Sequence, residues 1–247
     1  MYLTIQGLVL RVTDYNDRDS LLTLLTADYG KLTVKARGLR RKNSPLTAPC
    51  QLLALGEFTL FEYKGAYSIN EAHSLALFQG LRRDLQKLSL GTYFAQVAEL
   101  LSQEDMSNPE LLSLTLNSLH ALSDLDVPEL QVKAVFELRC SSLAGYMPDL
   151  YGCRNCGLKY PDRFDISSGS LECHSCRNMN SDGLRLPVSP GVLDAMRYVV
   201  SCDSKALFRF RTTQQTIEQL SQITEAYLTT QLERGFSTLD FYKSLLI

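Results

Sequence analysis

The sequence predicts an α+β protein with an N-terminal β-barrel of the oligonucleotide-binding (OB) type. An α-helical domain with an inserted four-cysteine zinc module follows it. Three observations predict this fold: strand-like alternation early in the chain, helical periodicity after Gly80, and two Cys-x-x-Cys pairs that interrupt the helical part. We therefore expect four segments, namely an OB-type barrel (1–79), a first helical part (80–150), the zinc module (151–187) and a second helical part (188–247).

The barrel prediction depends on five short apolar runs separated by turn signals. In such runs the side chains alternate between two faces, so that one face is apolar and the other polar. Lys64-Gly65 suits a tight hairpin turn between the last two runs. Five strands in about seventy residues are typical of an OB barrel. The expected strands lie around 8–12, 20–26, 31–38, 57–63 and 66–72.

A basic segment, defined as residues 31–42, holds six positive charges and no negative charge. Its strand part presents three of them on one face and the following loop adds the others. Such a strip beside barrel aromatics is typical of single-stranded nucleic-acid binding, although a solvated strand face would show the same pattern. The six candidates for DNA contact are Lys31, Lys35, Arg37, Arg40, Arg41 and Lys42.

Charge is segregated along the chain, although the formal net charge is only −2. Residues 1–80 contain nine Lys and Arg against seven Asp and Glu, whereas residues 81–150 contain five against ten. The global balance therefore hides a basic N-terminal region that is joined to an acidic middle.

Apolar residues recur every three to four positions in the remaining helical segments. A capping Asn108 followed by Pro109 marks one helix start, and Gly145 suits a left-handed helix end. Gly91 is a candidate interruption of the first long helix. The expected helices are 81–105, 110–125, 129–144, 191–201 and one from about 217 to 235.

Four of the seven cysteines follow a Cys-x2-Cys-x16-Cys-x2-Cys pattern, formed by Cys153, Cys156, Cys173 and Cys176. This spacing suits a tetrahedral site of four thiolates, for which zinc is the leading candidate and iron the alternative. Four thiolates close the coordination shell, so the metal is expected to be structural. His174 lies between two better-placed cysteines. A redox role would need a thioredoxin-like setting, which we do not find.

No catalytic motif accompanies these features. The sequence lacks a phosphate-binding loop, a nucleophile elbow and a His-Glu-x-x-His pair. His73 and His120 sit in apolar patterns that favour structural or solvated histidines. There is no signal-peptide pattern and no apolar run of membrane-spanning length. We therefore expect a cytoplasmic binding protein and not an enzyme.

The order of barrel, helices and cysteine module resembles the RecO family of bacterial recombination mediators. The segment 17-DRDSLLTLLTADYGKLTVKARGLRRKNSPL-46 looks like the second and third barrel strands of that family with their Lys/Arg-Gly loop. The segment 136-FELRCSSLAGYMPDL-150 is similar to the family's Phe-Glu-Leu helix, and it precedes Cys153 as in the metal-binding members.

This resemblance implies a DNA repair protein that binds single- and double-stranded DNA and anneals complementary strands. With RecR it would assist RecA loading on DNA coated by single-strand-binding protein, which also implies association with the nucleoid. The resemblance makes Lys133 and Arg139 candidates for contact with the acidic C-terminal tail of single-strand-binding protein. An adaptor that works through protein contacts, with little DNA affinity of its own, is the alternative.

Overall fold

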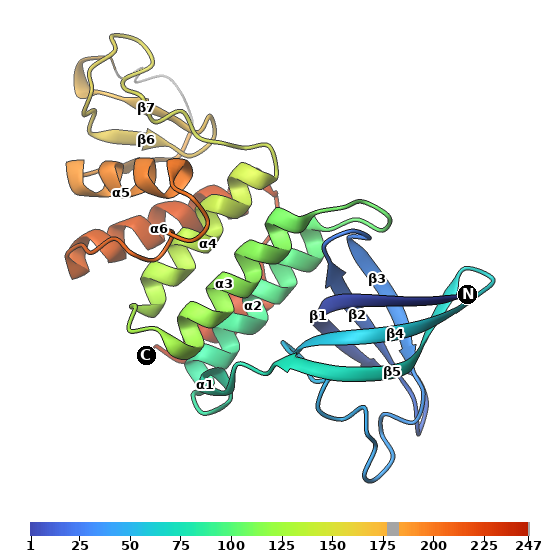
Figure 1. Cartoon of the computed structure of the whole chain (residues 1–247). Coiled ribbons are helices and arrows are strands. Elements are labelled where there is room, and N and C mark those ends of the chain that lie inside the picture. Colours follow the sequence, from blue (N-terminus) through green and yellow to red (C-terminus); the bar gives the residue numbers. More distant parts are fainter. Residues whose placement is uncertain (177–182, 247) are drawn as a thin grey trace. The chain divides into compact units, whose positions relative to one another are not determined.

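The computed structural model describes residues 1–176 and 183–246, and its chain forms two compact units (Figure 1). The barrel unit contains Met1–Leu125 and Phe236–Ile247, and the module unit contains Asp126–Gly235. We describe each unit by itself. The four predicted segment boundaries stay a prediction.

The barrel predicted from the sequence is confirmed. Its five strands close in the order β1-β2-β3-β5-β4, as in an OB-like barrel, with β3 and β5 parallel and the other neighbours antiparallel. The strands are β1 (Tyr2–Asp14), β2 (Ser20–Thr26), β3 (Lys31–Ala36), β4 (Leu55–Tyr63) and β5 (Ala66–Ala76).

Alternation of side chains builds the barrel core. On β4, Phe58 and Leu60 are fully buried, whereas Phe61 on the opposite face is exposed. Gly56 on the same strand allows a close approach, because a Cβ there would lie 2.9 Å from the Phe58 ring. The buried side chains from all five strands form one cluster, so β1 to β5 share a single core.

The helices of the barrel unit are α1 (Gln79–Arg82), α2 (Leu85–Leu101), α3 (Pro109–Asp124) and α7 (Ser237–Ser244). The prediction of one helix over 81–105 was wrong. Asp84 is extended and accepts hydrogen bonds from the N–H groups of Gln86 and Lys87, so it caps a new helix. Gly91 does not interrupt α2, and α7 was not predicted as a separate element.

The C-terminal end of α2 joins the barrel at the start of β3. The N–H of Lys31 donates to the carbonyl of Gln103 over 2.9 Å, and Arg11 on β1 pairs with Glu99 over 2.9 Å. Gly30 has φ of 61°, and a Cβ there would lie 2.3 Å from the Gln103 carbonyl oxygen. Only glycine therefore fits this junction, which fixes where the basic segment begins.

The module unit contains α4 (Glu129–Leu143), α5 (Pro190–Ser201), α6 (Gln214–Gln231) and a small sheet of order β7-β6-β8. The sheet strands are β6 (Arg163–Asp165), β7 (Ser170–Glu172) and β8 (Arg185–Pro187), and a 3-10 turn, η1, covers His174–Cys176. Strands β6 and β7 form a hairpin between the two cysteine pairs, and β8 pairs with β6 as a third strand.

Contacts with α6 hold this small sheet in place. The rings of Phe164 on β6 and Tyr227 on α6 meet edge to face at a centroid distance of 5.3 Å. Gln231 donates from Nε2 to the carbonyl of Ile166 over 2.8 Å. The module is thus supported by a helix that follows it in the sequence. Within the described residues, no helix has the length and apolar character that a membrane span requires.

Candidate functional site

Two of the three lysines of the basic segment are held by contacts within the barrel unit. Lys31 donates from Nζ to the carbonyl of Glu99 over 3.3 Å. The Nζ of Lys35 lies 3.2 Å from Oδ2 of Asp19 and 4.4 Å from the ring centroid of Tyr15. Both ammonium groups are half-buried among protein partners, so a phosphate would have to compete for them.

Of the other four cations of the segment, Arg40 also has internal partners and, within the described part of the chain, three do not. Arg40 lies 3.3 Å from Asp14 and donates to the carbonyl of Asn16. The side chains of Arg37, Arg41 and Lys42 are exposed and, among the described residues, form no ion pair with a carboxylate. We call these three residues the exposed trio, and they are the cations most accessible to an anionic ligand.

Asp19, at the start of β2, holds the base of the loop that carries the trio. Its Oδ1 accepts from the N–H of Gly38 over 2.9 Å, and its Oδ2 accepts from Nδ2 of Asn16 over 3.1 Å. These hydrogen bonds, with Lys35 as the charged partner, lower the pKa of Asp19 to about 2. Gly38 itself has φ of 70°, so the loop leaves β3 through a left-handed residue. The sequence did not indicate this role of Asp19.

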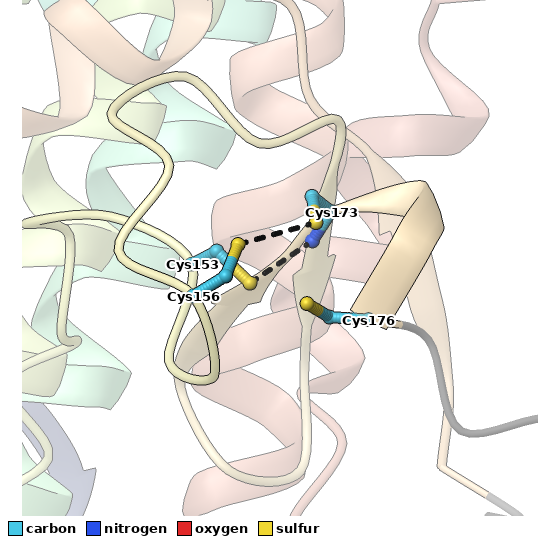
Figure 2. A group of neighbouring side chains, drawn as sticks. All are labelled: Cys153, Cys156, Cys173 and Cys176. Atoms are coloured by element: carbon cyan, nitrogen blue, oxygen red, sulfur yellow. Dashed lines mark hydrogen bonds between the residues drawn. The ribbon is translucent and has the colours of Figure 1, made fainter.

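The four predicted cysteine ligands come together, as Figure 2 shows. The Sγ atoms of Cys153, Cys156, Cys173 and Cys176 all lie within 4.8 Å of one another, and those of Cys156 and Cys173 are 3.6 Å apart. Tetrahedral thiolate coordination with metal–sulfur bonds of about 2.3 Å needs sulfurs about 3.8 Å apart. The arrangement could therefore bind one metal ion.

Backbone hydrogen bonds shape the first cysteine turn. The N–H of Gly157 donates to the carbonyl of Cys153, and the N–H of Cys153 donates to the carbonyl of Leu158, both over 2.8 Å. Gly157 has φ of 72°, which lets the chain reverse directly after Cys156. The N–H of Arg154 donates to the carbonyl of Leu171 and so joins this turn to β7.

The thiols of the cluster do not titrate alike. Burial raises the pKa of Cys153, but hydrogen bonds from the N–H groups of Asn155, Cys156 and Cys173 outweigh it and lower this pKa to about 6. Hydrogen bonds with Cys156 and Cys173 raise the pKa of Cys176 to about 12. The four thiols therefore do not ionise together unaided, and four adjacent thiolates need a cation to coexist.

None of the three histidines belongs to the four-sulfur group. His174 is exposed and is not part of the four-sulfur group. His73 pairs with Glu71 and His120 with Asp124 at exposed positions. Among the residues that the structure describes, the four cysteines are the one group of three or more His, Cys, Asp or Glu side chains with metal-binding geometry.

Lys133 lies in a buried ion cluster between α4 and α6. Only 1% of its surface is exposed, and its Nζ lies 2.9 Å from Oε1 of Glu137 and 2.8 Å from Oε2 of Glu225. The Oγ of Ser221 accepts from the same ammonium over 3.2 Å. Burial raises the pKa of Glu137, which Lys133 opposes. This environment argues against contact between Lys133 and a partner protein.

Arg139 is likewise engaged within the module unit. Its Nη1 donates to the carbonyl of Val200 over 3.2 Å and its Nη2 to the carbonyl of Cys202 over 2.6 Å. Both acceptors lie at the end of α5, where a helix leaves carbonyls without helical partners. Arg139 thus caps α5, a role that its position on a leucine-rich helix did not reveal.

The barrel, the basic segment, the helices and the four-cysteine cluster define a class of protein with an OB-like N-terminal domain and a helical remainder that holds a candidate metal site. The chain belongs to the RecO family of DNA repair and recombination proteins. Residues 1–78 match the family model of the recombination protein O N terminal, and residues 82–240 match that of the recombination protein O C terminal.

Curated relatives match over nearly the full length of the chain. The DNA repair protein RecO of Acetivibrio thermocellus is 31% identical over 246 residues, which cover 99% of this chain and 97% of the relative. That of Alkaliphilus metalliredigens is 27% identical, with coverage of 99% and 100%. That of Bacillus subtilis is 27% identical, with coverage of 90% and 86%.

Proposed function

We propose that this protein is a DNA-binding mediator of recombinational repair that binds single- and double-stranded DNA and anneals complementary strands. The observation that carries the proposal is the exposed trio, which stands on an anchored loop of an OB-like barrel. Cations without internal partners are available to phosphates, and OB barrels track single strands in this way. The family supports a role in DNA repair, and DNA binding and annealing refine it.

The mediator role includes partners. We infer that the protein acts with RecR to assist RecA loading on DNA that single-strand-binding protein has coated, and that it does so at the nucleoid in the cytoplasm, without catalysing a reaction. The C-terminal tail of single-strand-binding protein remains a proposed partner. The internal contacts of Lys133 and Arg139 do not support these two residues as its receptors.

The six basic residues are proposed to act in two groups. If all six met phosphates, the log–log salt slope for a single strand would be about −4, and the exposed trio alone would give about −2. Lys31, Lys35 and Arg40 have acceptors within the protein, so they would join only where the strand displaces these contacts. The observed slope therefore reports how many of the six take part.

We propose one structural zinc ion at the four cysteines. The four sulfurs fit the donor set that zinc favours, and a shell of four thiolates leaves no open position for substrate. The zinc would supply the positive charge that lets the thiols ionise together. Metal analysis of the purified protein separates zinc from iron, and about one zinc per chain is the expected result.

Strand annealing is the experiment that tests the mediator role. Two complementary oligonucleotides are mixed with the protein, with and without single-strand-binding protein, and duplex formation is followed by fluorescence. The test variant is Arg37→Ala/Arg41→Ala/Lys42→Ala. The control variant, Lys205→Ala/Arg209→Ala/Arg234→Ala, removes the same charge from exposed positions of the module unit.

We expect the wild-type protein and the control variant to anneal both naked and coated strands, and the trio variant to lose most of this activity. Wild-type protein that neither binds nor anneals DNA, yet binds the tail peptide in calorimetry, would favour the adaptor function instead. Equal loss in both variants would show that overall charge, and not the loop, carries binding.

A further inference from the structure

Three aromatic side chains gather on the outside of the barrel. Tyr2 on β1 and Phe61 on β4 are direct cross-strand partners, with ring centroids 5.4 Å apart and ring planes at 52°. Tyr63 follows two residues later on the same face of β4. Tyr2 and Tyr63 are each 62% exposed and Phe61 38% exposed. We call these three residues the aromatic patch.

The next two positions along this face of β1 and β4 are polar. The next cross-strand pair along β1 and β4 is Thr4 and Thr59, whose hydroxyls lie 3.3 Å apart, and the pair beyond it is Gln6 and Glu57. These polar pairs are what a strand face in contact with water usually carries, so the large aromatic side chains beside them need another explanation. Exposed aromatics at one end of a face therefore mark a site of interaction.

Strand register connects the aromatic patch to the basic segment. Phe61 faces Ser68 on β5, and Ser68 in turn faces Lys35 on β3. Residues directly opposite one another point to the same side of a sheet. Tyr2, Phe61, Ser68 and Lys35 thus form one row across four neighbouring strands on the outside of the barrel. The row ends two residues before Arg37, the first cation of the exposed trio.

The β4–β5 hairpin adds a cation at the other end of the patch. Its two turn residues, Lys64 and Gly65, have φ of 51° and 75°, as in a type I′ turn. This turn brings Nζ of Lys64 to 5.4 Å from the ring centroid of Tyr63. The aromatic patch therefore has positive charge on both sides, at Lys64 and at the basic segment.

We propose that the aromatic patch is a base-stacking platform for single-stranded nucleic acid, continuous with the basic segment. Bases lie against the exposed faces of Tyr2, Phe61 and Tyr63, while phosphates meet Lys64 and the exposed trio. Flat rings between cations complement a strand that alternates bases with phosphates, and such stacking tolerates any base. The inference rests on the proposed function, because it names the residues against which the bases of the same bound strand would stack.

The test compares an ordinary single strand with a strand of equal length and phosphate number that contains a run of abasic sites. Stacking contributes roughly 5- to 150-fold in affinity per base. We expect wild-type protein to bind the ordinary strand at least fivefold more tightly. Tyr2→Leu/Phe61→Leu/Tyr63→Leu should abolish this preference and leave the salt slope unchanged. Tyr151→Leu, which alters a tyrosine that is 94% exposed in the module unit, should retain it.

Photocrosslinking to a strand that carries iodouracil provides a second readout that needs no variant. Crosslinks to at least one residue of the aromatic patch are expected. Thermal unfolding of every variant shows whether it is folded. If the triple variant is unfolded, the single variant Tyr63→Leu, at the hairpin end, replaces it in the comparison of the ordinary and abasic strands.

The proposed function and this inference fail differently. Absence of any single-strand binding by the wild-type protein would overturn both. Salt-dependent binding without preference over the abasic strand, or crosslinks confined to other residues, would overturn the inference alone. Loss of RecR binding in the triple variant with unchanged base preference would overturn it too, and would make the patch a protein interface.

Discussion

Basic side chains have opposite environments in two regions of the molecule. In the module unit, Lys133 is 1% exposed and lies within 3 Å of carboxylate oxygens of Glu137 and Glu225. In the barrel unit, Arg37 and Arg41 are exposed beyond the end of β3. Charge that is paired inside a domain must keep its partners for the domain to stay stable, whereas charge left at the surface is available to a ligand.

The cysteine module shows the same inward use of charge. Glu172 on β7 is 1% exposed and pairs with Arg154 of the first cysteine turn and with Arg185 of β8, the latter over 2.8 Å. Arg185 also lies 3.7 Å from Asp165 on β6. These ion pairs connect the first cysteine turn to all three strands. We therefore expect the module to contribute mainly to folding and propose the barrel as the region that binds the ligand.

Removal of the metal ligands should have the most severe effect on the module. Cys153→Ser/Cys156→Ser should abolish zinc binding and unfold the module, because structural zinc contributes about 10 to 16 kcal/mol in small metal domains. Single-strand affinity should change little. Metal content, limited proteolysis and anisotropy with a labelled oligonucleotide measure the three effects.

Cys202→Ser, outside the cluster and only half-buried, is the control for this variant and should retain the metal. A Cys153→Ser/Cys156→Ser protein that stayed folded, resisted protease and lost annealing would show that the module, and not the barrel, carries the annealing function.

The buried ion cluster gives the next largest effect. Lys133→Met removes the ammonium beside Glu137 and should destabilise the module unit by about 3 to 5 kcal/mol. Urea unfolding followed by circular dichroism measures this loss. Lys133→Met/Glu137→Leu removes both charges and should recover much of the stability. If the single variant instead kept its stability and lost binding of the single-strand-binding protein tail, Lys133 would be a receptor after all.

Local patterns predicted most of the elements, because they act over a few residues. The alternation in 31-KLTVKA-36 and 57-EFTLFEY-63 predicted strands β3 and β4, and the cysteine spacing predicted the cluster. The helix break was missed, because Leu81, Leu85 and Leu88 keep helical spacing across Asp84. The capping role of Asp84 depends on only two hydrogen bonds.

The partners of charged residues could not be predicted, because they depend on tertiary contacts. From the sequence alone, Lys133 looks like an exposed charge on a helix. In the structure it pairs with Glu225 of α6, which lies 92 positions later in the chain. Lys35 likewise looks like an unpaired cation in the sequence, but the barrel places Asp19 next to it. The barrel aromatics divided in the same way, since Phe58 faces inward and Phe61 outward. The sequence pattern predicts which face of a helix or strand a residue lies on, but it does not predict which other element packs against that face.

Within the basic segment, salt dependence sharpens the distinction between free and internally bound cations. Arg37→Ala/Arg41→Ala/Lys42→Ala should reduce the magnitude of the log–log salt slope for single-stranded DNA by about 2. Lys31→Ala/Lys35→Ala should reduce it by less than about 1, because both ammonium groups already have protein acceptors. Equal reductions would show that the strand displaces the internal contacts.

The smallest expected effect concerns the anchor of the loop. The pKa of Asp19 is about 2 in the folded protein because its carboxylate accepts hydrogen bonds from Gly38 and Asn16 and faces Lys35. Since an unfolded Asp titrates near 3.9, its contribution to stability is complete above about pH 5 and is lost as the pH falls toward 2. The loop should therefore loosen in acid before the barrel core does.

Asp19→Asn should flatten this pH dependence between about 5 and 2 and should accelerate exchange of the Gly38 amide at neutral pH. Hydrogen exchange and thermal unfolding across that pH range measure the two effects, with Asp17→Asn as a control at an exposed neighbour. If the Gly38 amide exchanged equally fast in both variants, the loop would owe its position to Arg40 and the β3 backbone. The exposed trio would then be held independently of Asp19.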